Sequence, residues 1–253
     1  MPTIKYRSKR GKQLQGITTV KSQQIGWGKG GLMGWANKVG RGCGWFDLVE
    51  DLDRCSSCGG PIREIYLEEV QRTLSICRGM NLNEARDTAT IPGTIAHLLI
   101  ESFLKQEEPD LSEYSKEDIE KATAAFDNFK MWAKQFEFEP IAIEPHLISE
   151  MYQCGGTPDV IARVLGKVSI VDWKTGGIYE DLFVQLRFYK QAWEENYPDM
   201  PVTGGYHVLR IPRDQDTPRF HHSHWARLPQ ESWLAVQYAL GLKKCQEVLK
   251  GLL

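Results

Sequence analysis

The stretch covering residues 156–176, GTPDVIARVLGKVSIVDWKTG, constrains the fold most, because two runs of β-branched residues flank a Leu-Gly-Lys break. Such runs around a short glycine turn predict a β-hairpin. A turn centred on the Leu-Gly pair that ends at Gly166 places Asp159 opposite Asp172 on one face. The two-residue period of a strand puts Lys174 on that face as well. The hairpin therefore predicts a cluster of two carboxylates and one ammonium group.

This cluster has a chemical interpretation and a structural one. Two adjacent carboxylates repel, and one would take up a proton unless a cation lies between them. Mg²⁺ and Mn²⁺ prefer carboxylate oxygens and keep water molecules, one of which can attack a phosphorus atom. A lysine beside them can orient or deprotonate that water, or stabilise charge on the phosphate. The alternative is a cross-strand salt-bridge cluster on a solvated face of a sheet.

Two helical segments add pairs of polar residues at a spacing of four, which places each pair on one helix face. In the segment after Pro92, His97 and Glu101 lie among apolar residues, and the imidazole can complete a metal site. The alternative is a buried histidine hydrogen-bonded to Glu101. Further along, Gln185 and Tyr189 have the same spacing, with an amphipathic helix and a core tyrosine as the alternative.

Taken together, these segments resemble the RecB-like branch of the PD-(D/E)xK nuclease superfamily over about residues 90–195. The family pattern is a helix with G-x-x-x-H-x-x-x-E, then G-x-x-D, then (D/E)-x-K, then a helix with Q-x-x-x-Y. This chain matches all four in order and contains a literal Pro-Asp before the hairpin. The resemblance implies an α/β (α+β) fold with a restriction-endonuclease-like core, a central mixed β-sheet flanked by helices.

The resemblance also implies a metal site and a catalytic lysine. By similarity, His97, Asp159 and Asp172 would bind Mg²⁺ or Mn²⁺ together with the backbone carbonyl of Trp173. Lys174 would be the catalytic lysine.

Supporting roles come from the same resemblance. Gln185 and Tyr189 would position the motif or the DNA strand, and Glu101 would support the site. Glu144 matches a frequent acidic position before the metal-binding strand.

The function implied is a metal-dependent deoxyribonuclease, an exonuclease of recombination, repair or phage DNA processing that acts on single- or double-stranded DNA. A structure-specific endonuclease for flaps or branched DNA is one alternative. A non-catalytic, zinc-containing nucleic-acid-binding protein is another. The chain has no G-x-x-x-x-G-K-[ST] motif, which favours a stand-alone nuclease over a helicase–nuclease fusion. No protein partner is indicated.

The cysteines suggest a second metal site. Cys55 and Cys58 form a C-x-x-C loop followed by glycine, which suits a structural Zn²⁺ ion. Cys43 and Cys77 are the candidates for the other two ligands, although their spacing matches no standard pattern. The alternative is free, buried cysteines. Only Cys245 follows the nuclease core, so an iron–sulfur cluster is not expected.

The distribution of charged residues and cysteines predicts the domain organisation. Residues 1–46 hold nine basic and no acidic residues, whereas the remainder holds 22 basic and 33 acidic ones. We predict a basic arm at residues 1–46, which either holds phosphates or is a solvated tail. A cysteine-containing insertion at 47–90 and a nuclease core at 91–253 follow. No apolar run is long enough for a membrane span or a secretory signal, which predicts a cytoplasmic protein.

The periodicity of apolar residues predicts the remaining elements. They are a β-type run at 17–20, a helix beginning after Pro92, a helix at 116–136, strands within 140–175, a helix at 178–196, two strands within 203–226 and a helix at 229–253. In the histidine run at 221–224, His222 and His224 share a face of a strand, and we expect a solvated surface there rather than a metal site.

Overall fold

The structure is a computed structural model that describes residues 5–25, 82–174, 178–210 and 220–252, with only the helical backbone given for 82–90. The chain divides into two units, Met1–Gly28 with Ile91–Leu253, and Lys29–Thr90. All predicted nuclease residues belong to the first unit. The predicted domain boundary at residue 46 lies outside the described residues.

Helices and strands alternate in the order that the sequence predicts for the second half of the chain. The elements are β1 (Tyr6–Arg7), β2 (Gln13–Leu14), α1 (Ile17–Gln24), α4 (Leu82–Lys105), α5 (Lys116–Gln135), β3 (Glu139–Ile143), β4 (Leu147–Ser149), β5 (Cys154–Gly156), β6 (Val160–Val164), β7 (Lys167–Lys174), α6 (Asp181–Asn196), β8 (Gly205–Arg210), β9 (His221–Trp225) and α7 (Gln230–Lys250).

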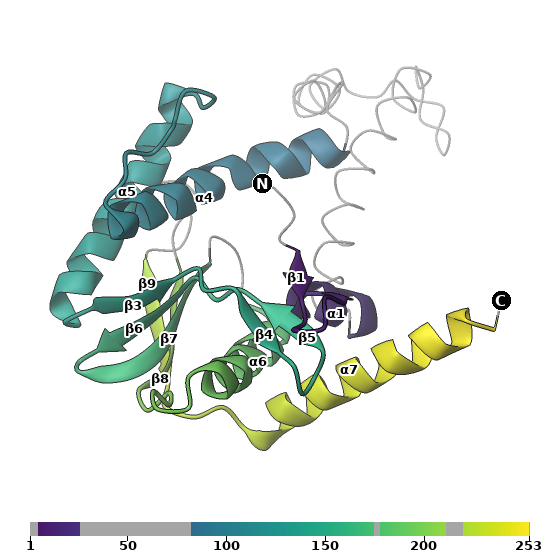
Figure 1. Ribbon diagram of the computed structural model, residues 1–253. Helices are drawn as coiled ribbons and strands as arrows, with labels where there is room; N and C mark the ends of the chain where they lie inside the picture. Colours follow the sequence, from purple (N-terminus) through teal and green to yellow (C-terminus); the bar gives the residue numbers. More distant parts are fainter. Residues whose placement is uncertain (1–4, 26–81, 175–177, 211–219, 253) are drawn as a thin grey trace, which may run out of the picture. The chain divides into compact units, whose positions relative to one another are not determined.

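The centre of the first unit is a five-stranded sheet with the strand order β3-β6-β7-β8-β9 (Figure 1). β7 and β8 are parallel, and the other neighbours are antiparallel, so the sheet is mixed. The α6 helix connects β7 to β8, as a parallel pair requires a crossover. The predicted fold class, a mixed sheet flanked by helices, is confirmed.

The β6–β7 hairpin has the predicted register. Val160 pairs with Val171 and Val164 pairs with Lys167, which extends to Asp159 opposite Asp172. The turn residues Leu165 and Gly166 have φ angles of 49° and 75°. Two successive positive φ values match the twist of the flanking strands.

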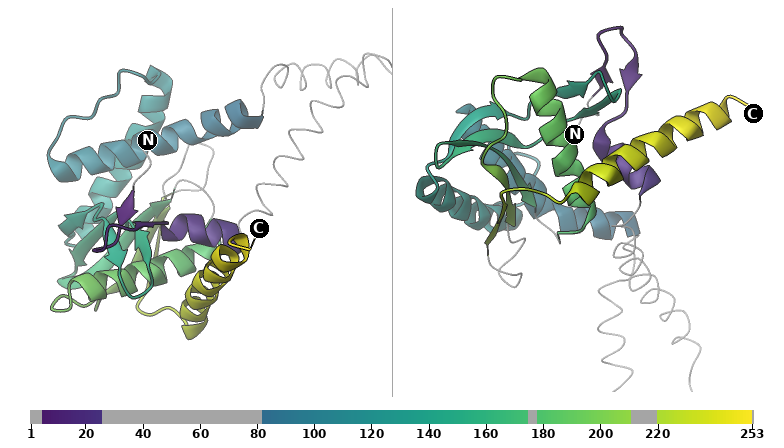
Figure 2. Two further views of the ribbon diagram at one scale, coloured as in Figure 1. Left: turned by 45° about the vertical axis from the view of Figure 1, so that its right-hand side comes forward. Right: turned by 90° about the horizontal axis from the view of Figure 1, so that it is seen from below.

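Helices α4 and α5 cover one face of the sheet (Figures 1 and 2). The buried cluster on this face joins Ile95 and Ile100 of α4 to Phe129 and Trp132 of α5 and to Trp173 of β7. The N-terminus of α5 is capped by Ser115, whose hydroxyl accepts a hydrogen bond from the backbone of the first helical turn.

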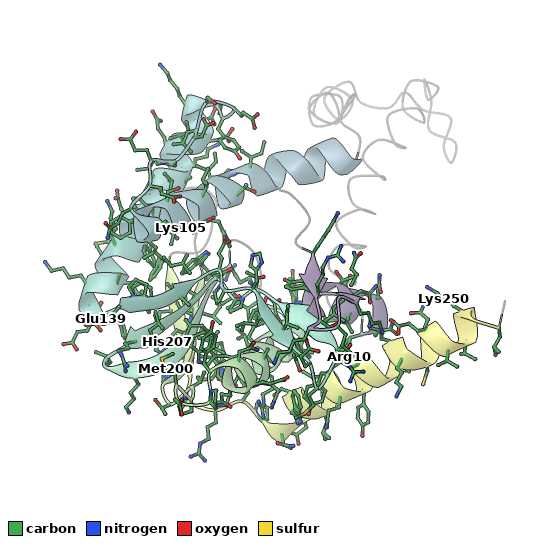
Figure 3. The ribbon with its side chains drawn as sticks, viewed as in Figure 1. Arg10, Lys105, Glu139, Met200, His207 and Lys250 are labelled. Carbon is green, nitrogen blue, oxygen red and sulfur yellow. The ribbon has the colours of Figure 1, made fainter. Side chains whose placement is uncertain are left out.

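Helices α1, α6 and α7 contribute to a second cluster, on the opposite face of the sheet. Figure 3 shows side chains filling the space between this face and α6. The largest fully buried side chains of α6 are those of Phe188, Tyr189 and Trp193. Within the described part of the chain, no helix is long and apolar enough to cross a membrane.

Two predicted elements differ from the structure. Residues 17–20 begin helix α1 rather than a strand, because Ile17 and Val20 lie three apart and both are fully buried on one helical face. Burial of that face overrides the strand preference of β-branched residues. Helix α4 begins ten residues before Pro92 instead of after it. An interior proline removes one helical hydrogen bond, and the packing of Ile95 and Ile100 on the core offsets this cost.

The N-terminal segment lies directly against the strand that precedes Asp159. The N–H of Gly155 donates to the carbonyl of Gln15 at 3.0 Å, and the ring of Tyr6 lies over Gly155 so closely that a Cβ there would lie 2.1 Å from it. The Tyr6 hydroxyl is 2.9 Å from the hydroxyl of Thr157. A glycine at 155 is therefore what allows the N-terminal segment to reach the Pro-Asp motif.

Candidate active site

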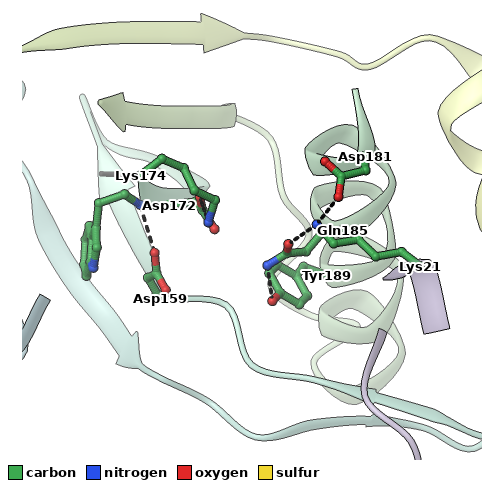
Figure 4. Close-up of polar contacts among 8 residues, drawn as sticks. Lys21, Asp159, Asp172, Lys174, Asp181, Gln185 and Tyr189 are labelled. Carbon is green, nitrogen blue, oxygen red and sulfur yellow. Dashed lines mark hydrogen bonds and ion pairs between the residues drawn. The ribbon is translucent and has the colours of Figure 1, made fainter. Parts of the chain in front are cut away.

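The hairpin brings Asp159, Asp172 and Lys174 together at the C-terminal end of β7 (Figure 4). Oδ2 of Asp159 accepts a hydrogen bond of 2.8 Å from the backbone N–H of Trp173. Nζ of Lys174 lies 2.6 Å from Oδ2 of Asp172. The predicted cluster of two carboxylates and one ammonium group is thus present in the structure. The salt-bridge alternative placed it on a solvated face, whereas the side chain of Asp172 is 1% exposed.

The Asp172 carboxylate is buried with little to balance its charge. Apart from the ammonium of Lys174, no donor in the described part of the chain reaches either of its oxygens. Burial, opposed by Lys174 and assisted by Asp159, raises the pKa of Asp172 to about 6. A buried charge with so few partners is costly, and binding a cation would reduce that cost.

The pKa values of Asp159 and Lys174, the charged neighbours of Asp172, are also shifted. Burial raises the pKa of Asp159, although Lys174 and the Trp173 N–H oppose the shift. Burial would lower the pKa of Lys174, but the charges of Asp172 and Asp159 outweigh it and raise that pKa above its ordinary value. Lys174 therefore remains an ammonium group at neutral pH.

His97 approaches this cluster from α4. Its ring makes an edge-on contact with the Trp173 ring, at 6.2 Å between centroids. Burial and the charge of Lys174 lower the pKa of His97 to about 4, against the opposing effect of Asp172 and Glu101. The imidazole is thus neutral at pH 7, the form that binds metals.

Glu101 and Glu144 form a second acidic group beside the first. Lys105 pairs with Glu101 one helical turn away, and its Nζ lies 3.6 Å from Glu144. Burial and a hydrogen bond to Glu101 raise the pKa of Glu144. The backbone N–H of Glu144 donates to the carbonyl of Asp159 at 2.9 Å, which ties this group to the hairpin. The sequence left open a buried histidine hydrogen-bonded to Glu101. Glu101 instead pairs with Lys105, and no hydrogen bond joins it to His97 in the described part of the chain.

Gln185 and Tyr189 touch each other on α6, as their spacing predicts. Nε2 of Gln185 lies 2.6 Å from the Tyr189 hydroxyl, and both side chains are buried. Burial and the charges of Asp172 and Asp159 raise the pKa of Tyr189 well above its usual range. The phenol is therefore protonated at neutral pH and lies near both carboxylates.

Two residues of this network were not predicted from the sequence. Lys21 of α1 forms an ion pair of 3.0 Å with Asp181 and a hydrogen bond of 2.9 Å with Oε1 of Gln185 (Figure 4). Asp181 is four residues before Gln185, so the repeated spacing of four along α6 was a usable signal. Nothing local in the sequence links Lys21 to α6.

The residues present fit a hard divalent cation. Two carboxylates from the two arms of the hairpin converge, and in the described part of the chain one of them has no donor besides Lys174, which suits the oxygen preference of Mg²⁺ and Mn²⁺. Among the described residues, no three histidine, cysteine, aspartate or glutamate side chains are arranged closely enough to enclose an ion. A small protein donor set is usual for Mg²⁺, which keeps several waters and takes substrate phosphate oxygens as ligands.

The other predicted metal sites have different outcomes. Cys43, Cys55, Cys58 and Cys77 lie outside the described residues, and the zinc site stays a prediction. The surface at 221–224 is less solvated than predicted, because the ring of His222 packs edge-on against the ring of Phe136. The two ring centroids are 4.7 Å apart.

Sequence comparison places this chain in a family. The model of the PD-(D/E)XK nuclease superfamily matches residues 66–251. Because the match covers most of the chain, the protein belongs to the PD-(D/E)XK nuclease superfamily, whose members typically use divalent metal ions. No curated protein matches the chain.

Two solved structures resemble parts of the chain. A putative exonuclease from Eubacterium rectale is 10% identical, with a TM-score of 0.43, over 63% of this chain and 65% of that one. The match therefore spans less than two thirds of that protein. A protein titled SSO0001 is 13% identical, with a TM-score of 0.29, over 60% of this chain and 74% of that one.

Proposed function

We propose that this protein is a Mg²⁺- or Mn²⁺-dependent deoxyribonuclease that hydrolyses phosphodiester bonds from DNA ends. The observation that carries the proposal is the buried Asp172 carboxylate, which lies beside Asp159 and which, among the described residues, is paired only with Lys174. Family membership supports a nuclease. The choice of DNA and of an exonuclease rests on the resemblance to the RecB-like branch.

Each residue has a role that follows from its chemistry. Asp159 and Asp172 would hold the cation. The resemblance adds neutral His97 and the Trp173 carbonyl as further ligands, which would require His97 to move closer to the two aspartates than it lies here. When bound, the cation would neutralise charge on the phosphate and activate water for attack. Lys174 would stabilise the negative charge that develops on the phosphate, since its ammonium is held close to the carboxylates.

Residues around this centre would act by positioning. Gln185 and Tyr189 would orient the phosphate or the hairpin, because they are buried beside both aspartates. Glu101 would support the site through its contact with Lys105 near Glu144.

Cleavage of four matched DNA substrates tests the proposal. We expect the wild-type protein to degrade end-labelled linear single- or double-stranded DNA in Mg²⁺ or Mn²⁺, and to leave it intact in EDTA. A closed single-stranded circle should survive, because an exonuclease requires an end. A 5′-flap substrate completes the set.

The outcomes separate the alternatives. Cutting of the closed circle, or a single incision at the flap junction, would replace the exonuclease with an endonuclease. Binding of DNA without cleavage in either metal would contradict a nuclease and favour a binding module. Degradation of a linear RNA of the same sequence, run beside the four DNA substrates, with no cleavage of DNA would keep the nuclease and overturn the choice of DNA.

A further inference from the structure

Lys21 connects the N-terminal helix to the polar chain of α6. Its Nζ donates to Oε1 of Gln185 at 2.9 Å and pairs with Asp181 at 3.0 Å, with only 13% of the Lys21 side chain exposed. On the other side of the amide, Nε2 of Gln185 lies 2.6 Å from the hydroxyl of Tyr189. Figure 4 shows the side chains of Lys21, Gln185 and Tyr189 joined by these contacts.

The chemistry of lysine sets the direction of this chain. An ammonium group has donors and no acceptor, so the amide atom that faces Lys21 must be the oxygen of Gln185. The amide nitrogen then faces Tyr189 and donates to its oxygen. The Tyr189 hydroxyl accepts this hydrogen bond, which leaves its own proton available to a different acceptor. Without Lys21, the Gln185 amide could turn over and take that proton instead.

The position of Tyr189 shows what that proton would reach. The side chain is 2% exposed, and its phenol interacts with the charges of Asp172 and Asp159, the two residues opposed across the hairpin. No hydrogen bond to either oxygen of Asp172 from Tyr189 is present among the described residues. The proton is therefore not consumed by Asp172, and a phosphate bound beside the two carboxylates would offer it an acceptor.

We propose that Lys21 is a positioning residue that fixes the direction of the chain Lys21→Gln185→Tyr189, so that the Tyr189 hydroxyl donates to a phosphate oxygen of the substrate. This inference rests on the proposed nuclease function for its substrate and on the contacts of Lys21 for its direction. It gives the N-terminal helix α1 a part in the reaction, although α1 carries none of the predicted site residues.

Reversing the direction of the chain tests the proposal. In Gln185→Glu both side-chain oxygens accept, so Lys21 keeps a partner while Tyr189 must give its proton to Glu. We expect kcat to fall roughly tenfold or more with KM within about twofold, as one hydrogen bond to a charged group is lost in the transition state. Tyr189→Phe should cause the same loss, and combining it with Gln185→Glu should cause no further loss.

Substitutions of Lys21 distinguish a residue that orients the Gln185 amide from one that only holds α1 against α6. Lys21→Met removes the donors and should lower kcat as Gln185→Glu does, whereas Lys21→Arg, which also only donates, should retain most of it. Lys244→Met, on the exposed face of α7, is the matched control. Thermal melting of each variant identifies any loss that comes from unfolding. Full activity in both Lys21→Met and Gln185→Glu, with a defective Tyr189→Phe, would overturn the proposal.

A spectroscopic readout tests the direction of the chain without cleavage. The side-chain NH₂ signals of Gln185 can be identified in a ¹H–¹⁵N spectrum by their absence in Gln185→Glu. We expect Tyr189→Phe to shift them, because the NH₂ group loses its acceptor. Unchanged signals would show that the amide faces the other way and would refute the inference. If the wild type cuts no DNA, the proposed function fails, and these signals still decide the direction.

Discussion

The substitution Asp172→Asn is expected to abolish DNA cleavage while making the metal-free protein more stable. Loss of a metal-binding carboxylate removes several kcal/mol of transition-state stabilisation, and each 1.4 kcal/mol is tenfold in rate. We therefore expect the cleavage rate to fall about a thousandfold or more. End-labelled linear DNA with saturating Mg²⁺ measures this effect.

The gain in stability follows from the raised pKa of Asp172. Its pKa is about 6 in the folded protein and lower in the unfolded chain, so the unfolded state releases the proton first as the pH rises. The metal-free protein should lose stability from about pH 4 until the folded carboxyl ionises above pH 6. A shift of about two units corresponds to roughly 3 kcal/mol. The attraction of Lys174 is already part of this pKa, so we expect Asp172→Asn to add ~2–3 kcal/mol at pH 8.

Urea unfolding in EDTA at pH 5 and pH 8 measures this second effect. Asp199→Asn, at an exposed carboxylate, is the control and should change neither stability nor cleavage. If Asp172→Asn were less stable than the wild type at pH 8, the buried charge would be better compensated than its contacts indicate. If it still cut DNA at the wild-type rate, Asp172 would not be a ligand of the catalytic metal.

Lys174→Ala is expected to lower the cleavage rate about a hundredfold or more without preventing folding. The ammonium is pre-positioned 2.6 Å from Asp172, where negative charge would develop on a phosphate bound through the proposed cation. Removing one such preorganised group typically costs two to three orders of magnitude in rate. Single-turnover cleavage at saturating Mg²⁺ isolates the chemical step from DNA binding.

The control for Lys174→Ala is Lys167→Ala. Lys167 begins the same strand and is exposed at the opposite end of β7, so its loss removes an equal charge far from the hairpin carboxylates. We expect its rate to stay within about twofold of the wild type. Equal losses in the two variants would mean that Lys174 acts through general attraction of DNA, and no loss in either would remove its catalytic role.

Local rules account for the parts of this site that were predictable. Strand periodicity and a two-residue turn place Asp159, Asp172 and Lys174 on one face, and both signals lie within 21 consecutive residues. The spacing of four likewise places Gln185 against Tyr189 on one helix. Each of these contacts joins residues whose separation is set by secondary structure alone.

Long-range packing determines the parts that the sequence did not predict. Lys21 contacts a residue 164 positions away, and no spacing rule operates over that distance. The β-branched run before Lys21 favoured a strand, whereas burial of Ile17 and Val20 against the core selects a helix. The Trp173 N–H bond to Asp159 is a different case: it lies within the hairpin, and periodicity places the carboxylate on the correct face without specifying which backbone group it binds.

Calorimetry of Mn²⁺ binding tests whether Asp159 and Asp172 form the metal site. We expect the wild type to bind Mn²⁺ in the concentration range that supports DNA cleavage. A folded variant carrying both Asp159→Asn and Asp172→Asn should lose at least about tenfold in affinity, since the two carboxylates supply the ligands that a hard cation prefers. Unchanged Mn²⁺ affinity in that variant, together with metal-dependent cleavage, would contradict the assignment of these residues as the metal site.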